Sequence, residues 1–221
     1  MASFAPRHPL IVDAHCDWAY NALYYGRDYH RSVHATRRLE RGSETEKRNG
    51  RCAVGLPELI RGRVGLVFGT VFVEPARRRL DANVPAYRDE REAHRLGMAQ
   101  LDFYHRLADE DPRVALIATK RALEAHINDW MQPGDPARHR QVGIVVLMEG
   151  AEPILEPKEL ERWYERGVRI VGLAWDATRY AGGTWNGGRL TKLGRALLEV
   201  MAEFNVILDV SHLSHEALFE A

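Results

Sequence analysis

Three potential metal ligands stand close together near the start of the chain, in the segment DAHCD at residues 13–17. The segment ends an apolar run that is predicted to be a strand, and side chains on a strand alternate between its two faces. His15 and Asp17 therefore point to the same side, where an imidazole and a carboxylate can share a divalent ion. Cys16 points to the opposite side and is predicted to be a small buried packing residue. An H-x-D pattern also occurs by chance, so these residues alone leave open that they bind no metal.

Two more ionisable residues follow apolar runs far along the chain. Glu149 ends VGIVVLMEG, where an unpaired carboxylate would be costly to bury, so a cation is expected beside it. His212 ends VILDVSH, and its alternative role is to cap the next helix or to bond to the backbone. Asp209 is predicted by alternation to face away from His212 as a structural partner. The remaining histidines are predicted to be solvated: His8, His30, His34, His94, His105, His126, His139 and His215.

The elements that must position these residues form an α/β pattern. Runs rich in Val, Ile and Leu alternate with helical patterns, which is typical of a parallel sheet covered on both faces. The carboxyl ends of parallel strands meet at one edge of the sheet, so the candidate ligands are predicted to converge there. The predicted strands cover residues 9–17, 64–74, 142–150, 168–175 and 206–212.

Helix signals lie between these strands. Spacings of three and four residues predict one apolar helix stripe, and Pro157 and Gly167 can open and end a second helix. Thr191 is predicted to cap a third helix that stops at Asn205, and Ser214 to cap a helix that begins at His215. The members of the first stripe are Leu96, Ala99, Phe103 and Leu107, and the third helix is predicted to bury Leu197, Met201 and Phe204.

Two polar segments show no such pattern. The charged stretch 26–51 is predicted to be a long surface loop near the site, with its charges solvated. The glycine-rich stretch 176–189 lacks a G-x-x-x-x-G-K pattern, so it is predicted to be a flexible loop over the mouth of the site and not a phosphate loop.

Composition excludes several classes of protein. The 221 residues are 45% hydrophobic and 28% charged, with 31 basic and 31 acidic residues, which predicts one globular domain and a small-molecule partner without nucleic acid. No apolar stretch approaches the about 20 residues of a membrane span, and the first residues lack the pattern of a secretory signal. Two cysteines, Cys16 and Cys52, form no disulfide framework, and a cytoplasmic location is expected.

Taken in order, DAHCD, MEG and LTKLGRALLEVMAEFNVILDVSHLS resemble the membrane (renal) dipeptidase family, zinc peptidases of the amidohydrolase superfamily. The resemblance extends from about residue 10 to the last residue. It implies a (β/α)8 TIM-type barrel with two zinc ions, His15 and Asp17 on the first, Glu149 bridging both, and His212 on the second. It also implies that a metal-bound hydroxide attacks the amide carbonyl of a dipeptide or similar small substrate, with Glu149 in the catalytic centre.

Two departures from the family pattern leave alternatives open. Family members read L-T-H where this chain reads Leu173, Ala174, Trp175. Trp175 is predicted to line the pocket and contact substrate; the alternative is an ordinary core tryptophan. A non-catalytic metal-binding or small-molecule-binding protein of the same fold also stays open, as do deamination and phosphoester cleavage.

The second departure is length. About five βα units can be counted, against eight in a full barrel of about 250 residues. Residues 1–221 are therefore expected to be a single, incomplete barrel domain that associates with itself through unpaired strand edges and has little activity alone.

Overall fold

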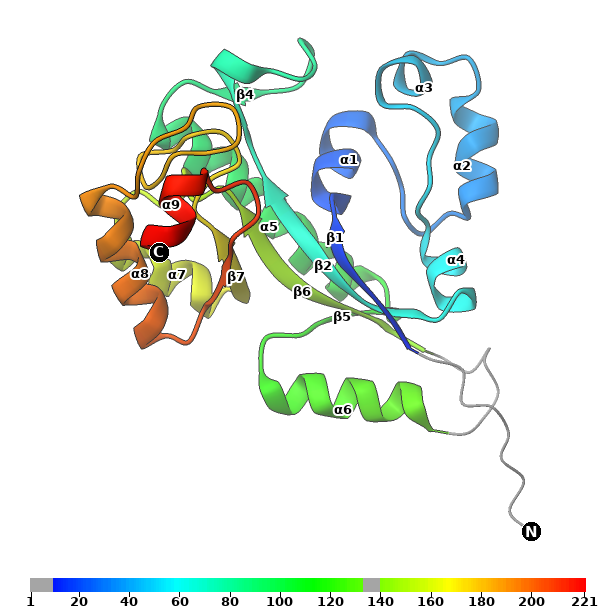
Figure 1. Cartoon of the computed structure of the whole chain (residues 1–221). Helices are drawn as coiled ribbons and strands as arrows, with labels where there is room; N and C mark the ends of the chain where they lie inside the picture. The colour runs from blue at the N-terminus through cyan, green and yellow to red at the C-terminus, as the bar shows by residue number, and fades with distance from the viewer. Residues whose placement is uncertain (1–9, 133–139) are drawn as a thin grey trace.

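The computed structural model describes residues 10–132 and 140–221. Its main sheet contains parallel strands that curl into half of a barrel (Figure 1). The strands are β1 (Ile11–Cys16), β2 (Val64–Phe72), β5 (Val114–Leu116), β6 (Val142–Glu149), β7 (Val168–Gly172) and β8 (Ile207–Asp209). They pair in the order β1-β2-β6-β7-β8, and β5 joins the amino end of β6. A separate parallel pair consists of β3 (Glu74–Pro75) and β4 (Ala86–Tyr87).

Helices fill most of the connections between these strands. The helices are α1 (Trp18–Tyr25), α2 (Val33–Glu40), α3 (Glu44–Asn49), α4 (Leu56–Arg61), α5 (Glu90–Glu110), α6 (Lys120–Met131), α7 (Leu160–Glu165), α8 (Lys192–Glu203) and α9 (His215–Glu220), with short 3-10 turns at Ala76–Arg78 and Pro157–Glu159. Within the described part of the chain, no helix combines the length and the apolar character needed to cross a membrane.

The two faces of the sheet have separate hydrophobic clusters because strand side chains alternate. On the outer face, Val67 and Ile144 belong to a large cluster with Tyr104 of α5, which lies behind the sheet in Figure 1. On the inner face, Leu66 and Val145 belong to a second cluster, against which residues of α6 pack. Glu149 follows Val145 by four residues and therefore ends β6 on the inner side.

The predicted caps of the later helices are confirmed. Thr191 accepts a hydrogen bond from the backbone N–H of Gly194, and Ser214 accepts one from Ala217. Asn205 and Gly167 both have positive φ angles, 53° and 100°, and end their helical segments as predicted.

Several sequence predictions about these elements are wrong. Residues 26–51 contain α2 and α3, which begin after Ser32 and Ser43, whose side chains accept hydrogen bonds from Ala35 and Glu46. Caps, and not an apolar period, start these short charged helices. Ala99 lies exposed on α5, because the buried stripe runs through residues next to it in sequence, such as Gln100.

The prediction that His126 is solvated is also wrong. The side chain is buried, and its Nε2 lies 2.6 Å from the carbonyl oxygen of Gly65. The predictions for His8 and His139 lie outside the described residues.

Candidate active site

His15 and Asp17 lie at the carboxyl end of β1, on the side predicted from alternation. His15 Nε2 is 3.5 Å from Asp17 Oδ1, and the hydroxyl of Thr70 on β2 donates a hydrogen bond to the same carboxylate oxygen. The hydrogen bond to Asp17 raises the pKa of His15 to about 9, with the nearby charge of Glu149 adding to the effect and burial opposing it. Burial alone would raise the pKa of Asp17, but the bonds from His15 and Thr70 lower it. Asp17 is therefore held as a carboxylate.

Cys16 lies in the outer core cluster with Trp18 and Tyr104, as expected for a side chain on the opposite face. Burial raises the pKa of its thiol, so the sulfur stays protonated at neutral pH.

Glu149 ends β6 and is the most buried of the candidate ligands, with 7% of its surface exposed. Its Oε2 lies 3.5 Å from His15 Nε2, and its Oε1 lies 3.0 Å from His212 Nε2. Burial raises the pKa of Glu149 to about 7; the charge of His15 opposes this shift, and the charges of Asp17 and Asp209 add to it. The carboxylate thus lies between two imidazoles, with one oxygen directed to each.

His212 reaches this position from a turn and not from a strand. The predicted strand 206–212 is too long, because β8 ends at Asp209 and His212 has a φ angle of 65°. Its Nδ1 lies 3.2 Å from the hydroxyl oxygen of Thr184, which belongs to the segment 176–189. Burial lowers the pKa of His212, with a smaller opposing effect of Asp209. The ring is therefore neutral at pH 7, the form in which imidazole binds metals.

Asp209 faces the site, contrary to the prediction that it points away from His212. The alternation of side chains between strand faces does not extend from Asp209 to His212, because β8 ends at Asp209. The charge of Asp209 acts on His15, Glu149 and His212, and its Oδ1 accepts a hydrogen bond from the backbone of Ser211. Gly172 pairs in register with both Glu149 and Asp209, so no side chain of β7 separates these two carboxylates.

Sequence reasoning also missed Thr70 and Thr184. Thr70 had a usable signal, since it is a polar residue in step with Leu66 and Phe68 on the inner face of an apolar strand. Thr184 lies in an irregular segment and had no comparable signal.

Segment 176–189, predicted to be flexible, has no helix or strand but is tied into the structure. Asn186 donates hydrogen bonds to the carboxylate of Asp176, and backbone bridges join Ala181 to Leu190 and Gly183 to Leu213. These contacts hold Thr184 beside His212.

Trp175 lies three residues beyond β7, so the predicted strand 168–175 is also too long. Its ring is half-buried at 5.0 Å from that of Phe72, and Trp175 and Glu149 line the same small cavity. This position allows contact with a ligand at Glu149, and the role of Trp175 in binding substrate stays a prediction.

The donor set fits a divalent metal ion. One ligand atom each from His15, Asp17 and Glu149 lies within 4.8 Å of the others. His212 lies next to this group, because its Nε2 is 3.0 Å from Glu149 Oε1. Imidazole nitrogens and carboxylate oxygens are ligands that zinc accepts. Among the described residues, no lysine or arginine forms an ion pair with Glu149. A buried carboxylate that faces histidines, and no lysine or arginine of the described residues, fits a site made for a cation.

A curled parallel sheet with candidate metal ligands at the carboxyl ends of its strands has the arrangement of an α/β-barrel protein with a site at that edge. Comparison with known proteins makes this specific: the sequence model of the membrane dipeptidase family, peptidase family M19, matches residues 3–221. The chain belongs to this family of dipeptidase-type hydrolases.

Individual relatives show the same similarity. An uncharacterized protein of Acinetobacter calcoaceticus, encoded in the PQQ-III 3' region, is 25% identical over 97% of this chain and 67% of its own length. The dipeptidase aclJ of Aspergillus oryzae is 29% identical over 73% of this chain and 37% of its own.

Solved structures share the fold. A metallopeptidase from Rhodobacter sphaeroides, bound to a phosphinate mimic of the dipeptide L-Ala-D-Ala, aligns with a TM-score of 0.68 and 19% identity over 93% of this chain and 59% of its own. The probable dipeptidase PvdM of Pseudomonas aeruginosa aligns with a TM-score of 0.70 and 18% identity over 96% of this chain and 48% of its own. The chain thus spans about half the length of these solved structures.

Proposed function

We propose that this chain forms the metal-holding part of a zinc-dependent dipeptidase, which hydrolyses the amide bond of a dipeptide or a similar small substrate. The observation that carries the proposal is the buried Glu149 carboxylate, which faces His15 and His212 and forms no ion pair with a lysine or arginine of the described residues. His15, Asp17, Glu149 and His212 would hold the metal. When bound, divalent zinc activates a water molecule for attack and polarises the amide carbonyl.

The protein's own residues orient the donors. Thr70 donates to Asp17, which fixes the carboxylate beside His15. His212 must present an unprotonated Nε2 to a metal, so its Nδ1 carries the hydrogen and donates it to the hydroxyl of Thr184. The two oxygens of Glu149 point toward different imidazoles, which suits a carboxylate that bridges two ions.

The choice of dipeptides as substrates is supported by family membership and by the relatives. One relative is named a dipeptidase, and another was solved with a mimic of L-Ala-D-Ala. Trp175, beside Glu149 in the same cavity, is a further element of our proposal as a contact for the substrate.

The test combines metal binding with hydrolysis. The metal-depleted 221-residue chain is titrated with zinc, and the full product of its gene is assayed for amino-acid release from a dipeptide panel, with and without a chelator. We expect zinc binding that Asp17→Asn weakens, and hydrolysis that the chelator abolishes. Absence of zinc binding would refute the proposal, whereas zinc binding by a full product that cleaves no dipeptide would favour a non-catalytic binding protein.

Self-association and a cytoplasmic location complete the proposal. β1 and β8 form the two ends of the main sheet, and Ile11, Val12 and Ile207 are exposed on them, which supports association of copies through strand edges. Light scattering across a dilution series measures this association.

The free thiols of Cys16 and Cys52 support a cytoplasmic location, because the cytoplasm is a reducing compartment. Fractionation of the producing cells tests this location.

A further inference from the structure

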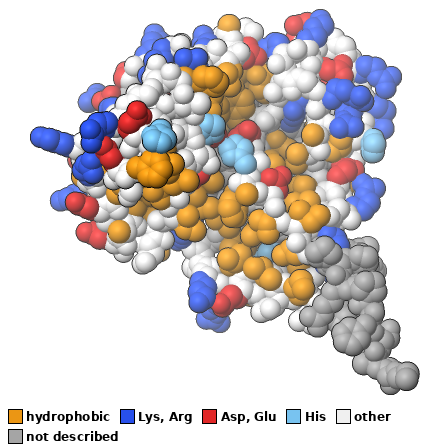
Figure 2. All heavy atoms as spheres, in the orientation of Figure 1, with side chains coloured by type: hydrophobic (Ala, Val, Ile, Leu, Met, Phe, Trp, Pro, Cys, Tyr) orange, Lys and Arg blue, Asp and Glu red, His pale blue; other side chains and the backbone are white. Residues whose placement is uncertain are grey.

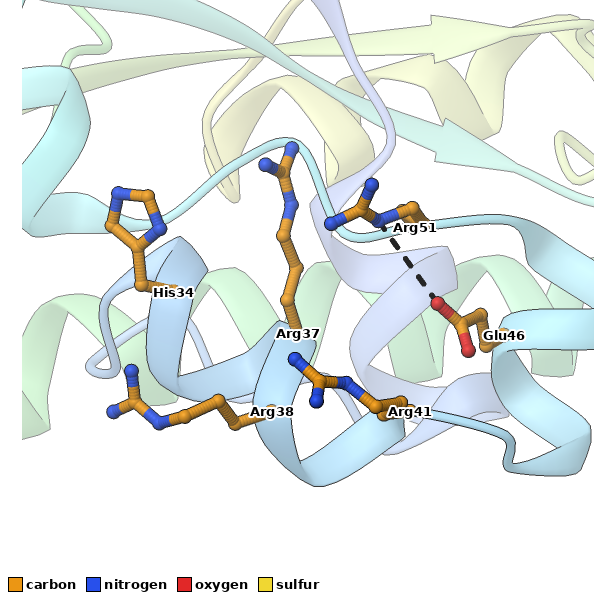
Figure 3. A pocket seen from close by; sticks show the side chains of 6 residues that line it. All are labelled: His34, Arg37, Arg38, Arg41, Glu46 and Arg51. Atoms are coloured by element: carbon orange, nitrogen blue, oxygen red, sulfur yellow. Dashed lines mark ion pairs between the residues drawn. The ribbon is translucent and has the colours of Figure 1, made fainter.

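A hollow of about 540 Å³ lies between α2, α3 and the segment that follows them. This volume is within the range of small-molecule sites. Figure 3 shows the side chains around it, which we call the arginine pocket: His34, Arg37, Arg38, Arg41, Glu46 and Arg51. The pocket thus brings residues of two helices and a third segment around one space.

The arginine pocket carries an excess of positive charge. Its lining contains four arginines and one carboxylate, that of Glu46. The Glu46 carboxylate already has other partners, because its Oε2 accepts a hydrogen bond from the backbone N–H of Gly42 and its Oε1 lies 4.0 Å from Arg51 Nε. The positive charges of these arginines repel one another because only one carboxylate lies among them. An anion between the guanidinium groups would relieve this repulsion.

Arginines next to the pocket are neutralised by protein carboxylates, and those of the pocket mostly are not. Arg27 pairs with Glu40, and Arg48 pairs with Asp81. In the described part of the chain, the side chains of Arg38 and Arg41 make no hydrogen bond or ion pair, so their guanidinium donors are available to a ligand.

Arg37 supplies a more fixed group. Its Nε donates to the carbonyl oxygen of Cys52 at 2.6 Å, which orients the guanidinium and leaves its two terminal nitrogens to bind elsewhere.

The helix dipole explains only part of this arrangement. Arg37 and Arg38 lie in the last turn of α2, where cations are favourable. That effect does not account for Arg51, which comes from beyond α3 and converges on the same hollow.

We propose that the arginine pocket binds a small molecule that carries two or more phosphate or carboxylate groups. Guanidinium groups are suited to both chemistries because they donate paired hydrogen bonds to planar or tetrahedral oxygens. Arg51 also lines a second hollow, of about 370 Å³, that contains His15 and Asp17. The ligand therefore lies beside the candidate metal site, although its binding does not depend on the proposed hydrolysis.

The test is calorimetric titration of the metal-depleted 221-residue chain with pyrophosphate and, separately, with citrate. The test variant is Arg38→Gln/Arg41→Gln, which changes exposed side chains outside the hydrophobic core. The control is Arg106→Gln/Arg121→Gln, which removes the same charge from exposed positions on α5 and α6. Thermal unfolding of both variants verifies that they fold.

We expect saturable binding of at least one anion, weakened about tenfold or more in the test variant and by less than about twofold in the control. Binding of pyrophosphate alone identifies a phosphate ligand, and binding of citrate alone identifies a carboxylate ligand. Absence of saturable binding of both anions at low salt would overturn the proposal. Equal weakening in the two variants would also overturn it, because the anion would then respond to net charge and not to the pocket.

Discussion

Replacing Glu149 by glutamine tests whether the candidate site is built around a cation. Burial raises the pKa of this carboxyl from 4.5 to about 7. At about 1.36 kcal/mol per pKa unit, the shift corresponds to about 3 kcal/mol between the protonated and ionised forms. Because the folded-state pKa is raised, the favourable contribution is complete below pH 4.5 and is lost as the pH rises through about 7. At pH 8 the metal-free chain therefore contains an unfavourably buried charge.

The substitution also removes an attraction, which reduces the expected gain. His15 has a pKa of about 9, so at pH 8 it is largely protonated, and its Nε2 lies 3.5 Å from Glu149. We therefore expect Glu149→Gln to stabilise the metal-depleted chain at pH 8 by about 1–2 kcal/mol, which raises Tm by about 2–8 °C. At pH 4 the parent carboxyl is largely protonated, and the gain should vanish.

Zinc should reverse this order of stability. A ligand at about 100 times its Kd stabilises the folded state by about 2.7 kcal/mol, so zinc should raise the Tm of the parent chain and have little effect on Glu149→Gln. Differential scanning calorimetry, with zinc and with a chelator, measures both effects.

The matched control is Glu152→Gln, in the segment that follows β6. Glu152 is also buried, but Arg179 Nε lies 2.8 Å from its Oε1, so a basic partner already neutralises it. This variant should be less stable with or without zinc and should keep the zinc response. The reasoning fails if Glu149→Gln destabilises the metal-depleted chain at pH 8 and still responds to zinc.

Three further predictions concern other residues of the site. Thr70→Val removes the donor to Asp17 and should weaken zinc binding about tenfold in calorimetry; unchanged affinity would contradict the orienting role. Zinc binding at pH 7.5 should release about one proton, since His15 with a pKa of about 9 must lose its proton to bind, and titrations in buffers of different ionisation enthalpy count it. Trp175→His should change kcat/KM across a dipeptide panel by about threefold or more while Tm moves by less than about 4 °C; identical kinetics would argue against substrate contact.

The alternation of strand side chains made part of the site predictable. His15 and Asp17 are two residues apart on β1, and Glu149 continues the inner face of β6. These inferences needed only the period of a strand and the rule that parallel strands end at one edge. The same period gave no valid relation between Asp209 and His212, because the residues between them leave the strand and His212 takes a positive φ angle.

Several short helices and strands of the fold could not be predicted from the sequence. β5 has three residues and pairs only with the amino end of β6, so its apolar signal is too brief to distinguish it from a turn. α2 and α3 are charged and have few buried residues, and their caps at Ser32 and Ser43 are the local signal that could have identified them. Elements that contribute little to the core carry little apolar pattern.

The charges of the site explain why separate segments converge on Glu149. A carboxylate at the end of an apolar strand is unfavourable alone, and here its nearest partners are two imidazoles from β1 and from the turn after β8. Only the protonated form of His15 compensates the charge, while burial keeps His212 neutral. Asp17 and Asp209 add further negative charge to the same space. A divalent ion carries two positive charges, so it would offset more of the negative charge of these three carboxylates than a single imidazolium can.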